Sequence, residues 1–192
     1  MSMPNWEYFL AIEQDLDKCT RYVQFCQQNY KTYSLEFARI IVASGAECDT
    51  IMKLLCRSIG SSRVPEKIGE CFPIVNSAYP KFVEHEIRIP RYGLSFTPWG
   101  TWSSTNSPDW WKNGYNKIKH ERDTSFENAN LENAIMATAG LLCTLLYYYE
   151  ELRLKQSIPL HIDFSQSPRL LSPRHYGPWQ DAEITWGYDL PQ

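Results

Sequence analysis

The sequence predicts an all-α fold: an up-and-down helical bundle of four to five helices with a small β-hairpin insert and an extended C-terminal arm. Three observations carry this prediction. Apolar side chains recur at alternating steps of three and four in residues 5–30 and 34–60, which is the period of one buried helix face. Residues 134–149 form the most apolar segment and contain no charge, as suits a core helix. After residue 155, five prolines interrupt the chain and the helical period ends.

The length of 192 residues fits one domain, because a chain of this size buries roughly two-thirds of its unfolded surface. We expect the helical domain to span residues 1–155, with the hairpin and a tryptophan-rich insert at about 80–108, and the arm to span 156–192. Several aromatic residues in the arm argue against simple disorder. We therefore expect the arm to pack either on the body or on a second subunit.

Charge and cysteine usage narrow the classes of function. The net charge of −3 leaves no broad electrostatic footprint for nucleic acid, although a local basic patch fits the composition. None of the six cysteines forms a CxxC pair, so we expect no metal and no cofactor. The N-terminus turns acidic at once, unlike a signal peptide, and the apolar run is too short to span a membrane comfortably. These features predict a cytoplasmic protein without membrane contact.

Capping residues indicate where the predicted helices begin and end. Asn5 can cap the first helix, residues 5–30, on which Glu13 and other charged residues fall on the polar face. Ser34 can cap the second helix, and Gly60 can end it in a left-handed conformation. Pro65 can start a third helix to about residue 78, which an internal proline should shorten or kink.

The spacing of apolar side chains changes after residue 80, from the helical period to an alternating one. Residues 82–90 alternate between apolar and polar side chains after the first two positions, and residues 92–96 alternate as well, which predicts the hairpin. The four tryptophans of residues 97–111 either cover the end of the bundle or form a platform for stacking nucleobases. A polar helix follows from residue 110 to about 122, with Ser107 or Asp109 as its cap. Asn130 then caps the core helix from 131 to about 154, which should be buried nearly all round.

The polar helix carries the candidate site. Asn116 and His120 are four residues apart and therefore share one helix face, while Tyr115, Lys119 and Arg122 fall on an adjoining face. A histidine near an amide, a phenol and several cations suits chemistry on a phosphodiester. The imidazole would transfer a proton, the cations would stabilise negative charge and the amide would orient the substrate. No metal is needed for such a reaction.

Structural explanations compete with this interpretation. His120 can be a hydrogen-bond donor that only supports packing, and the cations around it, including Lys117, can form a solvated helix face. Glu47 lies at the edge of the second helix's apolar stripe. It is either a boundary residue paired with a Lys or Arg, or an acidic partner for a histidine or arginine on a neighbouring helix. Asp49 and Lys53 have the spacing of an exposed helix pair.

Three stretches resemble bacterial proteins of the HEPN superfamily. The first is YNKIKHER followed by an F–AN–L entry into an apolar helix, and the second is SLEFARIIVASGAECDTIMKLLC. The third, YGLSFTPWGTW…PDWWKNGYNKIKHER, is similar to one uncharacterised HEPN-like branch. The resemblance covers roughly residues 5–154. It implies an all-α bundle that is usually dimeric, and many members are metal-independent endoribonucleases of toxin–antitoxin and phage-defence systems.

The superfamily's active motif is an arginine, then a polar residue that is often asparagine, and a histidine after four to six intervening positions. Asn116 and His120 match two positions, whereas Tyr115 stands at the arginine position and cannot supply its charge. Lys119 or Arg122 could replace that charge in space. Arg169 and His175 match the spacing by chance, because the prolines around them exclude a helix.

The resemblance implies an RNA-directed protein, in its catalytic form a metal-independent endoribonuclease, that acts as a homodimer with RNA and an antitoxin or defence-system protein as partners. The implied roles are catalytic for His120, Asn116, Tyr115 and Glu47, and substrate-binding for Lys119, Arg122, Lys117 and Trp111. The alternative is a non-catalytic HEPN-like helical module that binds a partner protein or a nucleotide.

Overall fold

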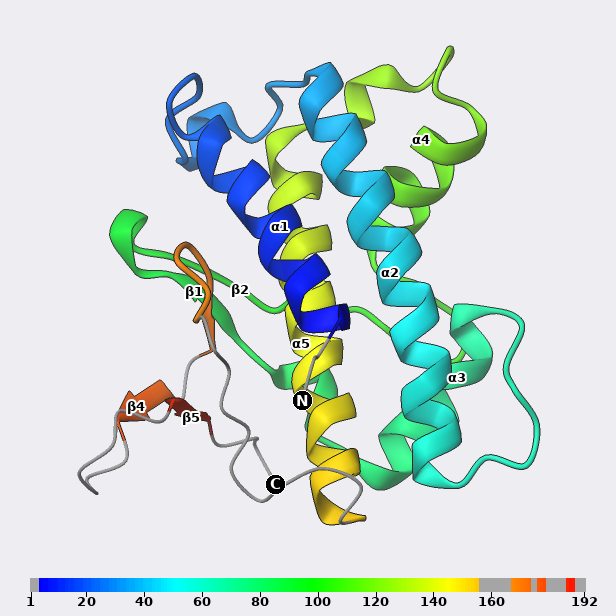
Figure 1. Ribbon diagram of the computed structural model, residues 1–192. Helices are drawn as coiled ribbons and strands as arrows, with labels where there is room; N and C mark the ends of the chain where they lie inside the picture. The colour runs from blue at the N-terminus through cyan, green and yellow to red at the C-terminus, as the bar shows by residue number, and fades with distance from the viewer. Residues whose placement is uncertain (1–3, 156–166, 174–175, 179–185, 189–192) are drawn as a thin grey trace.

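One long helix, α5 (Leu131–Leu154), forms the centre of the computed structural model, which describes residues 4–155, 167–173, 176–178 and 186–188. The other helices are α1 (Pro4–Cys19), α2 (Leu35–Ile59), α3 (Ile68–Ala78) and the short α4 (Lys117–His120). α1 and α2 lie across one side of α5, and α3 and α4 lie against α2 (Figure 1). The fold is therefore mainly helical, as predicted.

Helix α5 is the core of the protein. Asn130 caps it, because its side-chain oxygen accepts a hydrogen bond from the backbone N–H of Asn133 at 3.0 Å. Within the described part of the chain, α5 is the one helix long and apolar enough to cross a membrane. However, 83% of its most apolar window is buried inside the protein. The prediction of a core helix over 131–154, buried nearly all round, is confirmed.

The ends of α2 also agree with the prediction, whereas α1 is shorter than predicted. Ser34 accepts a hydrogen bond from the N–H of Phe37 at 3.1 Å, and Gly60 ends α2 with a φ of 110°. The first helix was expected to reach residue 30 but ends at Cys19. The Thr20 hydroxyl donates to the carbonyl of Asp17 at 2.7 Å, and the next N–H groups turn to the tighter i→i−3 pattern. Apolar spacing alone could not reveal this local competition.

A small antiparallel sheet departs from a purely helical bundle. Strands β1 (Ile87–Ile89) and β2 (Leu94–Phe96) form the predicted hairpin, with Ile87 opposite Phe96. Strand β3 (Ser172–Pro173), from the arm, pairs with the other edge of β1. Further along the arm, β4 (Tyr176–Pro178) pairs with β5 (Trp186–Tyr188). Residues 167–173 thus pack on the body, which was one of the two placements expected for the arm; His175 lies outside the described residues.

Glu13 binds the C-terminal arm through hydrogen bonds. The sequence had placed Glu13 on the polar face of the first helix, and that expectation is wrong. Glu13 is 2% exposed, and its carboxylate accepts hydrogen bonds from three consecutive N–H groups, those of Arg169 at 3.1 Å, Leu170 at 2.7 Å and Leu171 at 2.9 Å. Burial raises the pKa of this carboxyl, although the three N–H groups oppose the rise. The sequence pattern missed it because its partners lie more than 150 positions away along the chain.

The tryptophan-rich segment covers the bundle. Trp99, Trp102, Trp110 and Trp111 are all buried and lie in contact with one another, with Trp99 and Trp102 ring centroids 4.8 Å apart. The Trp99 indole donates to the carbonyl of Gly140 on α5 at 3.2 Å. Of the two interpretations of this segment, the buried rings support the structural one. Because all four tryptophan rings of residues 97–111 are buried, they do not form an exposed platform on which nucleobases could stack.

Candidate functional site

A π-helix (Trp110–Asn116) precedes α4, where the sequence predicted one continuous α-helix to about residue 122. A π-helix has more residues per turn than an α-helix, so positions i, i+1, i+4 and i+5 come to one side. Here those positions are Trp110, Trp111, Gly114 and Tyr115, and all four are buried. Helical structure ends at His120, so Arg122 lies in the following turn and not on the expected helix face.

Close contacts with glycine fix this π-helix in place. A Cβ atom built at Gly140 of α5 would lie 2.6 Å from Cζ2 of Trp110. One built at Gly45 of α2 would overlap the ring of Tyr115 and lie 2.9 Å from its Cε2 atom. The two rings therefore occupy space that only glycine leaves open. π-Helical turns of this kind occur often at functional sites.

Tyr115 positions Lys119. Its ring packs against Trp111, with 5.0 Å between the centroids, and its hydroxyl accepts a hydrogen bond from Nζ of Lys119 at 3.3 Å. The same ammonium lies 5.3 Å from the centroid of the Tyr115 ring, which is within reach of a cation–π interaction. A buried phenol thus holds a lysine at the surface, one helical turn later.

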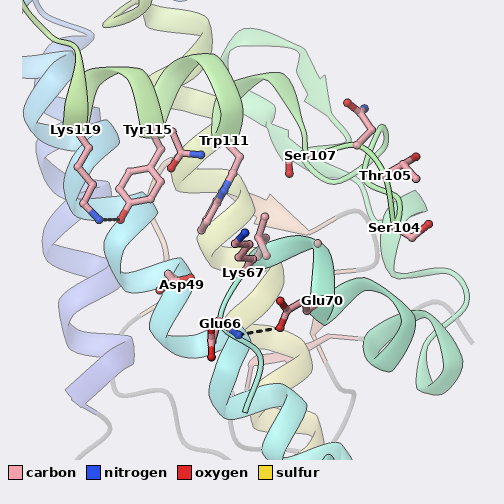
Figure 2. A pocket seen from close by; sticks show the side chains of 14 residues that line it. Asp49, Glu66, Lys67, Glu70, Ser104, Thr105, Ser107, Trp111, Tyr115 and Lys119 are labelled. Atoms are coloured by element: carbon pink, nitrogen blue, oxygen red, sulfur yellow. Dashed lines mark hydrogen bonds between the residues drawn. The ribbon is translucent and has the colours of Figure 1, made fainter. Parts of the chain in front are cut away.

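A cavity of about 630 Å³ lies beside this lysine, between α2, the start of α3, the 104–107 loop and the π-helix. Figure 2 shows side chains from the π-helix and α4 on one side and from the start of α3 on the other. Its lining residues are Asp49, Glu66, Lys67, Ile68, Gly69, Glu70, Ser104, Thr105, Asn106, Ser107, Trp111, Tyr115, Asn116 and Lys119. The volume is typical of a small-molecule binding site.

The acidic residues of the cavity already have cationic partners. Asp49 accepts a hydrogen bond from Lys53 at 2.6 Å, which confirms the predicted helix pair, although both side chains are half-buried. Arg63 lies 3.6 Å from Glu66 and 4.0 Å from Glu70. The Glu70 carboxylate also accepts the backbone N–H of Glu66 at 3.1 Å. Lys53 and the exposed Arg63 thus offset part of the negative charge of the three carboxylates.

The two cavity lysines are in the opposite situation. Among the described residues, no carboxylate lies within 4.0 Å of Nζ of Lys67 or Lys119. Lys67 precedes α3, and the first turn of that helix, with Gly69, faces the cavity. A helix N-terminus presents free N–H groups and a partial positive charge. Two lysines and a helix N-terminus therefore line the cavity, which makes it suited to an anion.

The structure brings together four of the eight site residues that the sequence suggested: Trp111, Tyr115, Asn116 and Lys119 line the cavity. Lys117 is half-buried, His120 and Arg122 are exposed, and none of the three lines it. Asn116 and His120 thus differ in setting, since the first faces the cavity and the second lies one helical turn beyond it.

Glu47 is half-buried on α2 and does not line the cavity. Burial raises the pKa of its carboxyl, and its charge in turn acts on Tyr149 of α5. Asp49 supplies the α2 carboxylate instead. Sequence reasoning also missed Lys67 and the 104–107 loop, because nothing in their local pattern points to a site that forms only when distant segments meet.

Comparisons with protein-family models, with curated proteins and with solved structures found no match to this chain. The functional interpretation therefore depends on the cavity and its surroundings. Among the described residues, no group of three or more His, Cys, Asp or Glu side chains is arranged to hold a metal ion.

Proposed function

We propose that this chain is a HEPN-like, RNA-directed protein that holds a nucleotide, free or within an RNA strand, in the cavity between α2, α3 and the π-helix. One observation carries the proposal. The acidic groups of the cavity have cationic partners, whereas Lys67 and Lys119 have no carboxylate partner among the described residues. An anionic ligand would supply the missing charge.

The other walls suit the remaining parts of a nucleotide. A phosphate near Lys67 and Lys119 would also meet the first-turn N–H groups of α3. The side-chain amide of Asn116 and the hydroxyls of the 104–107 loop offer hydrogen bonds to a base edge or to ribose. Trp111 also lines the cavity and, being 5% exposed, offers the base only a narrow apolar contact. Specificity for RNA would come from the groups that contact the 2′-hydroxyl.

Metal-independent RNA cleavage is the second candidate function, and the position of Lys119 favours it. Tyr115 occupies the motif's arginine position, but its hydroxyl holds the Lys119 ammonium at 3.3 Å and so provides a cation close by. His120 follows immediately and is exposed to solvent. In this proposal a strand bound at Lys119 passes His120, which transfers the proton during cleavage while Asn116 orients the phosphate.

The proposal also includes a cytoplasmic homodimer with an antitoxin or defence-system partner. Its support is an exposed apolar surface at the start of α2, where Leu35 is 77% and Tyr33 is 54% exposed. Light scattering after size-exclusion chromatography would measure the mass of the assembly. A Leu35→Asp variant that stays folded should shift it toward the monomer, whereas an unchanged mass would place the interface elsewhere.

Binding measurements test the main proposal. Titration calorimetry with AMP and fluorescence anisotropy with a short labelled RNA separate the free nucleotide from the strand. Lys67→Ala and Lys119→Ala should each weaken binding by roughly 10- to 100-fold, since a hydrogen bond to a charged group contributes about 1.5–3 kcal/mol. Lys81→Ala is the control, because Lys81 is exposed and lies outside the cavity. Absence of binding, or an equal loss in the control, would contradict the proposal.

Cleavage is tested separately by incubating the protein with RNA in EDTA. If the second candidate is correct, the wild type cuts RNA, and His120→Ala still binds RNA but no longer cuts it. If both leave RNA intact while RNA binding depends on Lys67 and Lys119, the protein is the non-catalytic module. Cleavage that survives in His120→Ala would exclude His120 as the proton-transfer residue.

A further inference from the structure

Two buried cysteines face each other across the contact between α2 and α3. Cys56 on α2 and Cys71 on α3 are 0% and 1% exposed, and their thiols interact directly. Both are free thiols. In Figure 1, α3 lies beside the C-terminal part of α2, and the two helices are in contact. Cys56 and Cys71 are separated in sequence only by residues 57–70.

The other cysteines have different surroundings. Cys19 donates to the carbonyl of Asp15 of its own helix, and Cys48 lies 3.5 Å from the Thr144 hydroxyl. Cys143 is fully buried in the core, and Cys26 is half-exposed. Among the described cysteines, Cys56 and Cys71 are the pair in which each thiol shifts the pKa of the other.

We propose that Cys56 and Cys71 form a reversible disulfide that fastens the first turn of α3 to α2. The oxidant is a peroxide: the Cys56 thiolate attacks one peroxide oxygen, giving a sulfenic acid and one water. The Cys71 sulfur then attacks the Cys56 sulfur, and the sulfenic hydroxyl leaves as a second water. Two thiols and one hydrogen peroxide thus become one disulfide and two waters, and both electrons are taken up by the peroxide.

The two thiols differ in a way that suits these two roles. Hydrogen bonding from Cys71 lowers the pKa of Cys56, against the effect of its burial. The same interaction, together with burial, raises the pKa of Cys71. A buried pair in which one thiol pKa is lowered and the other is raised can supply both an attacking thiolate and a resolving thiol. A pair of this kind in a cytoplasmic protein is more consistent with a transient, redox-sensing bond than with a permanent one.

Helix α3 is also built to allow oxidant access. Lys67 provides no side-chain cap at its start, and Pro73 inside the helix removes one backbone hydrogen bond. The preceding residues, 60–67, are mostly exposed. Local opening of α3 can therefore expose both thiols without unfolding the α2–α5 core.

The disulfide would act on the cavity wall. Cys71 follows Glu70 directly, and its Sγ lies 3.7 Å from the carbonyl oxygen of Lys67, which lines the cavity. Cys56 belongs to the same helix as Asp49 on the facing wall. A covalent bond between them limits the motion of these two walls relative to each other. This inference concerns the protein alone and stands whether or not a nucleotide binds.

The test is oxidation of the folded, full-length protein with hydrogen peroxide, followed by mass spectrometry without reduction. The intact mass should fall by two hydrogen atoms, and a peptide map should link Cys56 to Cys71. Dithiothreitol should reverse both changes. The melting temperature of the oxidised protein should rise by roughly 5–10 °C, because a disulfide that closes a loop of about 15 residues stabilises the folded state by about 3 kcal/mol. Amide exchange at residues 68–71 should slow.

Single variants keep the test decisive. Cys56→Ser and Cys71→Ser should each abolish the mass loss and the rise in melting temperature, whereas Cys26→Ser should retain both. If either buried variant fails to fold, the wild-type peptide map still decides the question. The inference is overturned if the oxidised folded protein keeps both thiols, if the link joins other cysteines, or if it forms only in denaturant.

Discussion

Replacing Gly45 with alanine tests the packing that positions the candidate site. The added methyl group would overlap Cγ and Cδ2 of Tyr115 and lie 2.9 Å from Cε2. The ring cannot simply turn aside, because Trp111 packs against it with 5.0 Å between the centroids. The methyl group must therefore push either the π-helix away from α2 or the tyrosine out of its rotamer.

The size of the effect follows from two opposing contributions. Inserting a methyl group into a packed core costs typically 1–3 kcal/mol, and overlap with three ring atoms of Tyr115 places this case near 3 kcal/mol. Alanine gains about 1 kcal/mol over glycine inside a helix such as α2. We therefore expect Gly45→Ala to lower the free energy of unfolding by about 2 kcal/mol and the melting temperature by roughly 4–8 °C.

The assay is urea unfolding, followed by the fluorescence of the buried tryptophans. Gly69→Ala is the matched control, because the nearest atom to its added methyl group is a Ser104 carbonyl oxygen at 3.6 Å, an ordinary contact. It should be neutral or slightly stabilising. In a Tyr115→Ala background the Gly45→Ala change should lose its cost, giving a coupling energy of about 3 kcal/mol. A Gly45→Ala protein as stable as Gly69→Ala would refute this account of the packing.

Three further predictions concern the arm and a helix cap. Glu13→Ala leaves three N–H groups without their acceptor, so the arm should detach at a cost of about 3–5 kcal/mol, and trypsin should cut after Arg169 much faster than in a Gln14→Ala control. Because burial raises the pKa of Glu13 above its unfolded value, the folded state binds the proton more tightly. Wild-type stability relative to Glu13→Gln should therefore be greatest below about pH 4.5 and fall as the pH rises through the folded pKa. Asn130→Ala removes the acceptor of the Asn133 N–H and should cost about 1 kcal/mol in urea unfolding.

Local chemistry decided which parts of the fold could be predicted. Ser34, Gly60 and Asn130 each act on backbone groups within three or four residues, so their roles could be read from the sequence. The first helix was predicted too long because apolar spacing continues past Cys19, where the Thr20 hydroxyl competes for a backbone carbonyl. A pattern of apolar residues shows which face of a helix packs on the core. It does not show where a side-chain hydroxyl competes for a backbone carbonyl and ends the helix.

Partners that are distant in sequence were not predicted. Strand β3 and the Glu13 carboxylate acquire their roles only when the arm folds back on α1 and β1. In the candidate site, too, residues close together in the sequence were predicted and distant ones were not. Trp111, Tyr115, Asn116 and Lys119 lie within nine residues of one another and were all suggested by the sequence. Asp49 and Lys67 come from α2 and the start of α3, and only the tertiary structure brings them to the cavity.

Tyr115 connects the packing between α2 and the π-helix with the position of a charge at the cavity. An arginine at position 115 would have to bury a charge against Gly45, where the structure places an aromatic ring. The ring fills that space, and its hydroxyl reaches out to hold the Lys119 ammonium at 3.3 Å. The positive charge therefore lies one helical turn further along, on Lys119, which lines the cavity. The buried ring of Tyr115, which packs against Gly45, therefore determines the position of the Lys119 ammonium, whichever anion the site binds.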